Sequence, residues 1–116
     1  VFHNLTKRRA FSMKRFKGNQ GNWSIGKNGS EVISDQRTNR KGYSEKDWES
    51  EKEYYGGYII CESIETIANV QLLVTSKDLL DASIQALKYL QRTGITYDNA
   101  ELFNTLDKAI NKALGL

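Results

Sequence analysis

Few side chains in this sequence could do chemistry, and their spacing does not assemble a catalytic set. The only histidine, His3, stands near the N-terminus, remote from every predicted element, so acid–base catalysis by histidine and histidine-containing metal sites lack their main participant. The single cysteine, Cys61, ends an apolar run, where a reduced, buried thiol is the expected state and a reactive thiol the alternative. Gly56 and Gly57 lack the spacing of a phosphate-binding loop. We therefore expect no catalytic residues, no cofactor and no metal site, and a protein that is not an enzyme.

Carboxylates and aromatic rings gather in a polar insertion, residues 36–55. Its acidic residues lie in a run of alternating charge, which is typical of a solvated face, and we favour that interpretation over a carboxylate pair or a cation site. They are Glu45, Asp47, Glu49, Glu51 and Glu53. The same stretch holds Trp48, Tyr54 and Tyr55. These rings either anchor the insertion to the body of the domain or form a contact surface, and we favour the anchor.

Positive charge is concentrated at the N-terminus. The first 30 residues hold seven of the 17 basic residues and no acidic one, within a net charge of +3. Such an arm can displace counterions from a phosphate backbone, so binding of nucleic acid is the alternative function. Its candidate residues are Lys7, Arg8, Arg9, Lys14, Arg15 and Lys17. The chain begins with Val1, and Met13 is the alternative natural start.

Composition places the chain among ordinary globular proteins. Hydrophobic residues make up 39% and charged residues 27%, and no apolar run approaches the roughly 18 residues that span a bilayer. We find no secretory leader. We therefore expect a cytoplasmic protein without a membrane partner. Its predicted organisation is a flexible basic arm over residues 1–20 and a single domain over residues 21–116.

Two patterns predict a short antiparallel sheet. Asn28 and Gly29 separate two alternating apolar runs, which predicts a β-hairpin with a type I′ turn. The register then pairs Ile25 with Val32 and places Trp23 on their face, the expected core face. A third strand is predicted at residues 58–61, which are apolar on both faces. Within the insertion, Ser44 and Asp47 form a capping pattern that indicates a short helix.

The C-terminal half is predicted to be helical in three segments. Ser63 caps a helix over residues 64–75 whose apolar residues surround its axis, which indicates deep burial. Ser76 caps a second helix that ends at Gly94 in a left-handed conformation. Asp98 opens the third, with Glu101 completing a capping box and Tyr97 packing on Leu102.

Apolar spacing predicts the helical core. Its members are Leu80, Ile84, Leu87 and Leu90 in the second helix, and Leu102 or Phe103, Leu106, Ile110 and Ala113 or Leu114 in the third. The fold class is thus α+β: a short antiparallel sheet, made of a hairpin and a third strand, covered by a C-terminal three-helix half.

The helical centre, residues 65–82, resembles a pattern of short phage and prophage accessory proteins. These proteins carry an N-terminal Gly-x-Trp element, a few strands, and then Ala-Asn-Ala-x-Leu-Ile-Ala-x-Ala-Pro-x-Leu-Leu-x-Ala-Leu. The corresponding residues here are Gly21, Trp23, Ala68, Asn69, Leu72, Leu79, Leu80 and Ala82. The departures are Val70 and Val74 in place of alanines and Lys77 in place of the proline.

The resemblance implies a phage-type accessory protein that acts on its host without turnover. It would bind a host protein or a small signalling ligand stoichiometrically, in counter-defence or in host modulation. Trp23 and Asn69 are then binding candidates beside Trp48, Tyr54 and Tyr55, although a hydrogen bond to strand backbone is the alternative role of Asn69.

Two segments lack a predicted cover, because the third strand and the helix at 64–75 are apolar on all sides. Either the insertion folds back over the sheet or a second copy supplies the missing layer. We favour a homodimer that uses helix 64–75 or the last helix.

Overall fold

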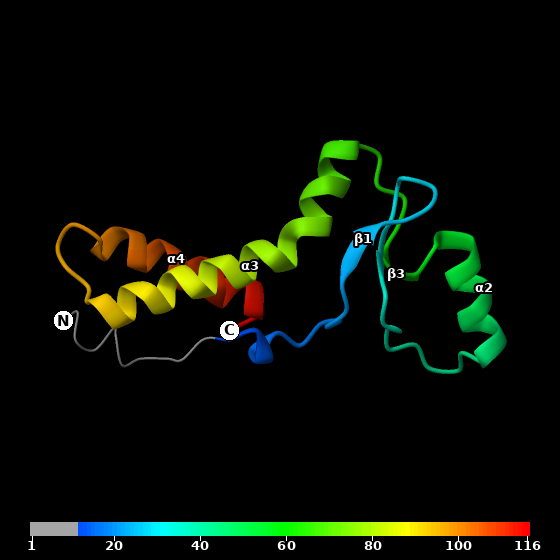
Figure 1. Ribbon diagram of the computed structural model, residues 1–116, viewed down its shortest axis with the longest axis horizontal. Coiled ribbons are helices and arrows are strands. Elements are labelled where there is room, and N and C mark those ends of the chain that lie inside the picture. Colours follow the sequence, from blue (N-terminus) through cyan, green and yellow to red (C-terminus); the bar gives the residue numbers. More distant parts are fainter. Residues whose placement is uncertain (1–11) are drawn as a thin grey trace. The chain divides into compact units, whose positions relative to one another are not determined.

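The computed structural model describes residues 12–116. They form a three-stranded antiparallel sheet and three α-helices, together with one turn of 3-10 helix, η1 (Met13–Arg15) (Figure 1). The predicted α+β class is confirmed. The predicted residues His3, Lys7, Arg8 and Arg9 lie outside the described part.

The chain divides into two compact units. The sheet unit comprises Gly18–Lys77, and the helical unit comprises residues 78–116 together with the segment that ends at Lys17. One helix, α3 (Ile67–Thr93), runs from the first unit into the second.

The sheet has the order β1 (Trp23–Ile25), β2 (Val32–Ser34) and β3 (Tyr58–Cys61). Trp23 pairs with Ser34 and Ile25 with Val32, so the predicted hairpin register is confirmed. The predicted third strand is confirmed as well. It pairs antiparallel with β2, with a register irregularity between Val32 and Ile33.

The hairpin turn differs from the prediction. Among the described residues Gly29 has a φ of 83°, but Asn28 is not in the positive-φ region, so the turn is not of type I′. The cause is Glu31, which is only 2% exposed. Its side chain accepts a hydrogen bond from the Asn28 N–H at 2.7 Å. The buried carboxylate thereby holds the loop in a wider conformation, closed by the Gly26 N–H and the Glu31 carbonyl at 3.1 Å.

The predicted core face of the hairpin is only partly correct. Val32 is fully buried, but Ile25 is 40% exposed, and Ile33, on the opposite face, is buried. The difference follows from position in the sheet, because β2 is the central strand and is covered on both faces, whereas β1 is an edge strand.

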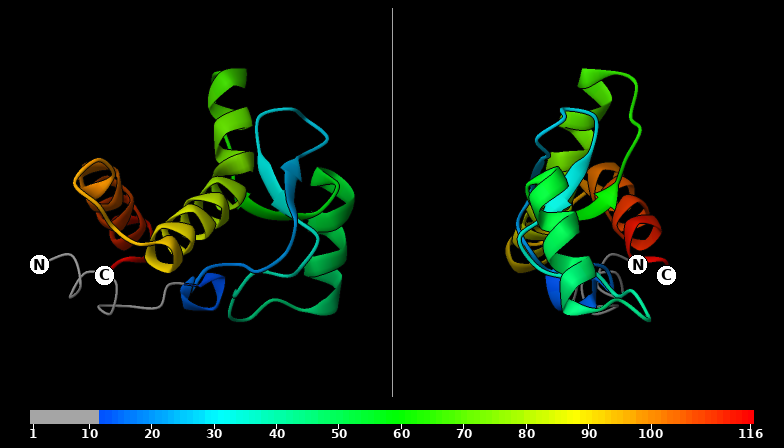
Figure 2. Two further views of the ribbon diagram at one scale, coloured as in Figure 1. Left: turned by 60° about the vertical axis from the view of Figure 1, so that its left-hand side comes forward. Right: turned by 90° about the vertical axis from the view of Figure 1, so that its right-hand side faces the viewer.

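Much of the polar insertion is helix α2 (Glu45–Tyr55). Ser44 and Asp47 make the predicted capping box. Trp48 is 7% exposed and contacts Tyr43 and Tyr58 edge to face, with ring centroids 4.7 and 5.4 Å apart. Helix α2 lies beside β3 (Figure 2). The buried Trp48 ring acts as the predicted anchor, whereas Tyr54, at 66% exposed, does not.

The two helices predicted over 64–75 and from Ser76 are one continuous helix, α3. Ser76 does not cap, because its hydroxyl donates to the Leu73 carbonyl at 2.7 Å within the helix. Ser63 does not cap either, since it has a φ of 61° and the helix begins only at Ile67. The C-terminal half therefore has two helices, and the third helix of the fold is α2. The predicted stop at Gly94 is confirmed by its φ of 106°.

The predicted deep burial of residues 64–75 is wrong for the single chain. Val70 is fully buried, but Ile67 and Leu72 are 58% and 60% exposed. An apolar composition all round the axis does not say which faces the rest of the chain covers. The homodimer that would cover them stays a prediction.

The helical unit is built on two apolar stripes that face each other. Ile84 and Leu87 of α3 pack with Phe103 and Ile110 of α4 (Ala100–Leu114), each at most 1% exposed. Partly buried residues complete this core: Met13, Leu80, Leu90, Ile95, Leu106 and Leu114. The predicted core positions are confirmed, and of the two pairs of alternatives Phe103 and Leu114 belong to the core, whereas Leu102 and Ala113 are exposed.

The predicted start of the last helix is wrong. Its N-cap residue is Asn99, which makes no side-chain capping bond. Its side chain serves the preceding connection instead, accepting from the Thr96 N–H at 2.8 Å and donating to the Gly94 carbonyl at 3.3 Å. Tyr97 and Leu102 are 92% and 53% exposed, so the predicted packing of Tyr97 on Leu102 buries neither side chain.

Candidate functional site

A pocket of about 720 Å³ lies between helix α2, strand β3 and the loop before α2, wholly within the sheet unit. One face of α2 supplies a wall, because positions 47, 50, 51 and 54 follow helical spacing. The lining is polar and aromatic. It consists of Arg40, Gly42, Tyr43, Asp47, Ser50, Glu51, Tyr54, Tyr55, Ile59 and Glu62.

Glu51 is the buried charge of this pocket. Its side chain is 6% exposed, and its Oε1 atom forms an ion pair with the Arg40 Nη1 atom. Its other oxygen, Oε2, is buried and has no hydrogen-bond partner among the described residues. A buried carboxylate oxygen without a donor is costly, so this atom is a ready acceptor for an N–H or O–H group.

Arg40 connects the loop to the pocket. Besides Glu51, its guanidinium donates to the Tyr43 hydroxyl at 2.7 Å and to the Ile59 carbonyl at 3.4 Å. Burial disfavours its charged form, but the hydrogen bonds to Tyr43 and the charge of Glu51 outweigh this effect and raise the pKa of Arg40. Arg40 therefore stays a cation while it holds one oxygen of Glu51.

Tyr55 and Glu62 form the opposite polar pair of the pocket. The Tyr55 hydroxyl donates to the Glu62 Oε2 atom at 2.7 Å. This hydrogen bond raises the pKa of Tyr55 to about 12. The phenol of Tyr55 therefore keeps its proton at neutral pH and donates it to the Glu62 side chain.

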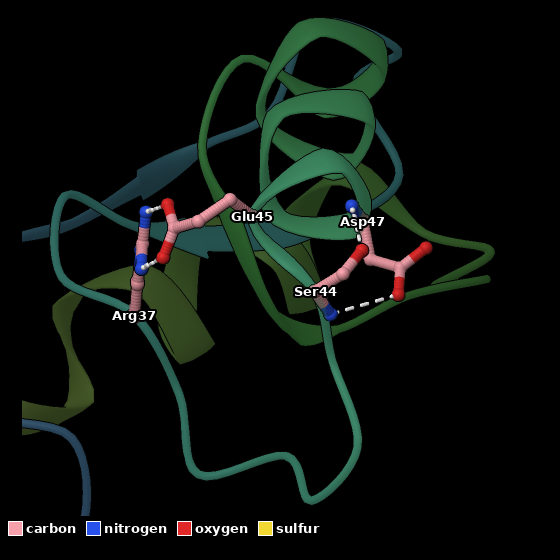
Figure 3. Close-up of polar contacts among 4 residues, drawn as sticks. All are labelled: Arg37, Ser44, Glu45 and Asp47. Carbon is pink, nitrogen blue, oxygen red and sulfur yellow. Dashed lines mark hydrogen bonds and ion pairs between the residues drawn. The ribbon is translucent and has the colours of Figure 1, made fainter.

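A second polar cluster fixes the start of α2 (Figure 3). Arg37 forms a two-pronged ion pair with Glu45, with nitrogen–oxygen distances of 2.7 and 2.5 Å. The hydrogen bonds of this pair raise the pKa of Arg37 and lower the pKa of Glu45. Beside it, the Ser44 hydroxyl accepts from the Asp47 N–H, and the Asp47 carboxylate accepts from the Ser44 N–H. These contacts set the first turn of the helix that carries the pocket wall.

The structure brings together only some of the predicted binding residues. Tyr54 and Tyr55 line the pocket, and Trp48 packs in the sheet unit as an anchor. Neither Trp23 nor Asn69 lines it. Asn69 is exposed on α3.

Trp23 belongs to a different contact of the sheet unit. The Lys77 Nζ atom lies 5.3 Å from the centre of the Trp23 ring and also donates to the Gly21 carbonyl. Lys77 thus ties α3 to the Gly-x-Trp element, which gives this departure from the phage pattern a structural role.

Sequence reasoning missed Arg40 and Glu62 as site residues and assigned Glu51 to a solvated face. Arg40 and Glu51 are 11 residues apart, and no short-range pattern joins an arginine in a loop to a glutamate in a helix. The one available signal was the helical spacing of Asp47, Glu51 and Tyr54, which places all three side chains on one face of the helix.

The basic residues of the alternative function are only partly described. Lys14 and Lys17 are exposed, whereas Lys7, Arg8 and Arg9 lie outside the described residues. Binding of nucleic acid stays a prediction.

Metal sites and membrane-spanning helices are two further features to consider in residues 12–116. Over residues 12–116, no group of three His, Cys, Asp or Glu side chains is placed to hold a metal ion. No helix in that range is long and apolar enough to cross a membrane.

A family model matches residues 13–116, and the family is one of phage proteins. Its description is Salmonella phage P22 protein Y8K6, and the chain belongs to this family. The phage character implied by the resemblance is confirmed, and the particular motifs on which it rested stay predictions. The comparisons with curated proteins and with solved structures returned no match.

Proposed function

We propose that this phage protein is an accessory binding protein that occupies a host protein or a small signalling ligand stoichiometrically, in counter-defence or host modulation. The binding site is the pocket between α2 and β3. The protein acts by occupation and not by turnover.

The observation that carries the proposal is the pocket's combination of exposed rings and a buried carboxylate oxygen without a donor. Tyr54, at 66% exposed, offers apolar area that no described residue covers completely. Tyrosine is enriched at binding surfaces because it combines a large ring with a hydroxyl. An acceptor without a donor adds a polar contact that an N–H or O–H group of a partner can complete.

Co-purification from the phage's host tests the proposal. The tagged full chain is expressed during host growth, and its complexes are analysed by mass spectrometry and light scattering. We expect a complex of fixed stoichiometry that the Tyr54→Ala variant loses. The mass of the chain alone, in the same measurement, tests the predicted homodimer.

Tyr97→Ala is the matched control. Tyr97 is 92% exposed and lies in the helical unit, outside the pocket, so its loss should leave the complex intact. Equal retention by both variants, or turnover of a captured ligand, would contradict the proposal.

A further inference from the structure

The pocket between α2 and β3 carries an excess of negative charge. Three carboxylates line it, those of Asp47, Glu51 and Glu62, against the single guanidinium of Arg40. A concave surface of one prevailing sign favours a ligand group of the opposite sign. An anion would instead meet three like charges.

Resting on the proposed function, we propose that this pocket takes a cationic nitrogen group of its partner, a guanidinium or an ammonium. The Glu51 Oε2 atom accepts one of its N–H groups, and the rings of Tyr54 and Tyr55 form its wall. The group belongs either to a small molecule or to an Arg or Lys side chain of a protein.

Arg40 provides an internal example of the contact. Its guanidinium binds the Glu51 Oε1 atom and lies 5.1 Å from the centre of the Tyr43 ring. A ligand would repeat this arrangement on the other oxygen. Because Oε2 is covered in the chain alone, a neighbouring side chain must move to admit a ligand.

The tyrosines give the second half of the site. The rings of Tyr54 and Tyr55 pack edge to face with centroids 4.6 Å apart, so Tyr55 supports the exposed ring of Tyr54. A cation over a ring face is attracted by the ring quadrupole, and guanidinium groups make this contact more often than ammonium groups. Since the Tyr55 hydroxyl is engaged by Glu62, its ring is held in place.

Matched probes test the chemistry. The isotope-labelled full chain is titrated with N-acetylarginine amide, and separately with N-acetylcitrulline amide, which has the same shape without the charge. We expect saturable NMR shifts at the amides of Ser50, Glu51 and Tyr54 with the arginine probe, at about millimolar affinity, and none with citrulline. Agmatine and an arginine-containing peptide form the other two arms, and tighter binding of one identifies a small-molecule or a protein source.

Two variants keep the test decisive. Glu51→Gln should weaken binding of the arginine probe by about tenfold or more, because a charge-assisted hydrogen bond is lost, whereas Glu49→Gln, exposed on the same helix, should not. If Glu51→Gln fails to fold, Tyr54→Phe and Tyr54→Ala replace it: the first should keep binding and the second lose it.

Equal shifts with citrulline, or no saturable shifts, would overturn the assignment. If the host complex still depends on Tyr54 in that case, the proposed function stands and only its cationic ligand falls. If the arginine probe binds saturably but no host complex forms, the cationic site stands and the proposed function falls.

Discussion

Each of the two units of this chain has its own kind of core. In the helical unit, four apolar residues from two helices interlock and each is at most 1% exposed. The sheet unit buries three polar side chains, Glu31, Ser34 and Glu51, and each of them bonds a residue elsewhere in the unit. Among the described residues of the helical unit, Asp107 is the one buried polar side chain. The difference teaches where function can reside. Interlocking apolar side chains offer a ligand no polar contact, whereas the buried Glu51 carboxylate has one oxygen without a donor.

Removal of the ring that anchors α2 should lower the stability of the sheet unit more than any other change proposed here. Trp48→Ala should lower the free energy of unfolding by about 3–5 kcal/mol, because a large buried ring leaves a cavity between α2 and β3. Denaturant unfolding measures it, and hydrogen exchange should show the sheet unit losing protection first. Glu49→Ala, at an exposed position of the same helix, is the control and should change stability by less than about 0.5 kcal/mol. Equal effects of the two substitutions would mean that α2 is not anchored.

The helical core should respond almost as strongly. Leu87→Ala should cost about 2–5 kcal/mol, since Leu87 is fully buried between α3 and α4. Leu102→Ala, at a 53% exposed position of the same unit, is the matched control and should melt close to the parent. A thermal melt in which both variants behave alike would show that the apolar face of α4 is assigned to the wrong residues.

Substitution in the hairpin turn should lower stability moderately, through the backbone conformation alone. No heavy atom lies within 4 Å of a Cβ placed at Gly29, so the cost of Gly29→Val comes from the backbone strain of a β-branched residue at a φ of 83°. The expected cost is about 1–2 kcal/mol. Ser30→Val should cost less, because Ser30 has no positive φ. Indistinguishable melting temperatures would refute a left-handed residue at position 29.

The cap of α2 should matter less. Ser44→Ala should cost about 1 kcal/mol, because the Asp47 N–H then loses its acceptor. Ser50→Ala, within the same helix, serves as the control. Loss of the cap should also disturb the pocket wall that α2 carries. A change in the NMR chemical shift of the Glu51 amide in the Ser44 variant is therefore a second readout.

The smallest effect should come from the exposed pair of Arg37 and Glu45. The pKa of Glu45 is lowered by its hydrogen bond to Arg37, so the pair stabilises the fold above the ordinary carboxyl pKa and loses its effect as pH falls through the lowered value. Arg37→Gln should raise the NMR titration midpoint of the Glu45 carboxyl, while Lys41→Gln should leave it in place. An unchanged midpoint in the Arg37 variant would mean that the pair does not persist in solution.

Short-range signals were sufficient for most elements. The pairing of Ile25 with Val32, the capping box of Ser44 and Asp47, and the apolar stripe from Ile84 to Leu87 each depend on residues only a few positions apart. Such contacts form with little loop entropy, so the local sequence determines them.

The same signals failed where a distant or competing contact decided the outcome. The Ser76 hydroxyl found a carbonyl within the helix and let α3 continue. Asn99 used its side chain on the preceding connection instead of capping α4. Serine and asparagine side chains have several backbone partners within reach, and a sequence pattern does not choose among them.

The sequence by itself determined an α+β phage-type chain with a short sheet, a capped helix in its polar insertion and an apolar helical half. Only the tertiary structure decided the pocket. It places Arg40 of a loop against Glu51 of α2, and Tyr55 of the same helix against Glu62 beyond β3. The physical reason is that an acid in a helix has the same local preference whether it faces solvent or an arginine of a distant loop, so its burial depends on how the chain folds back.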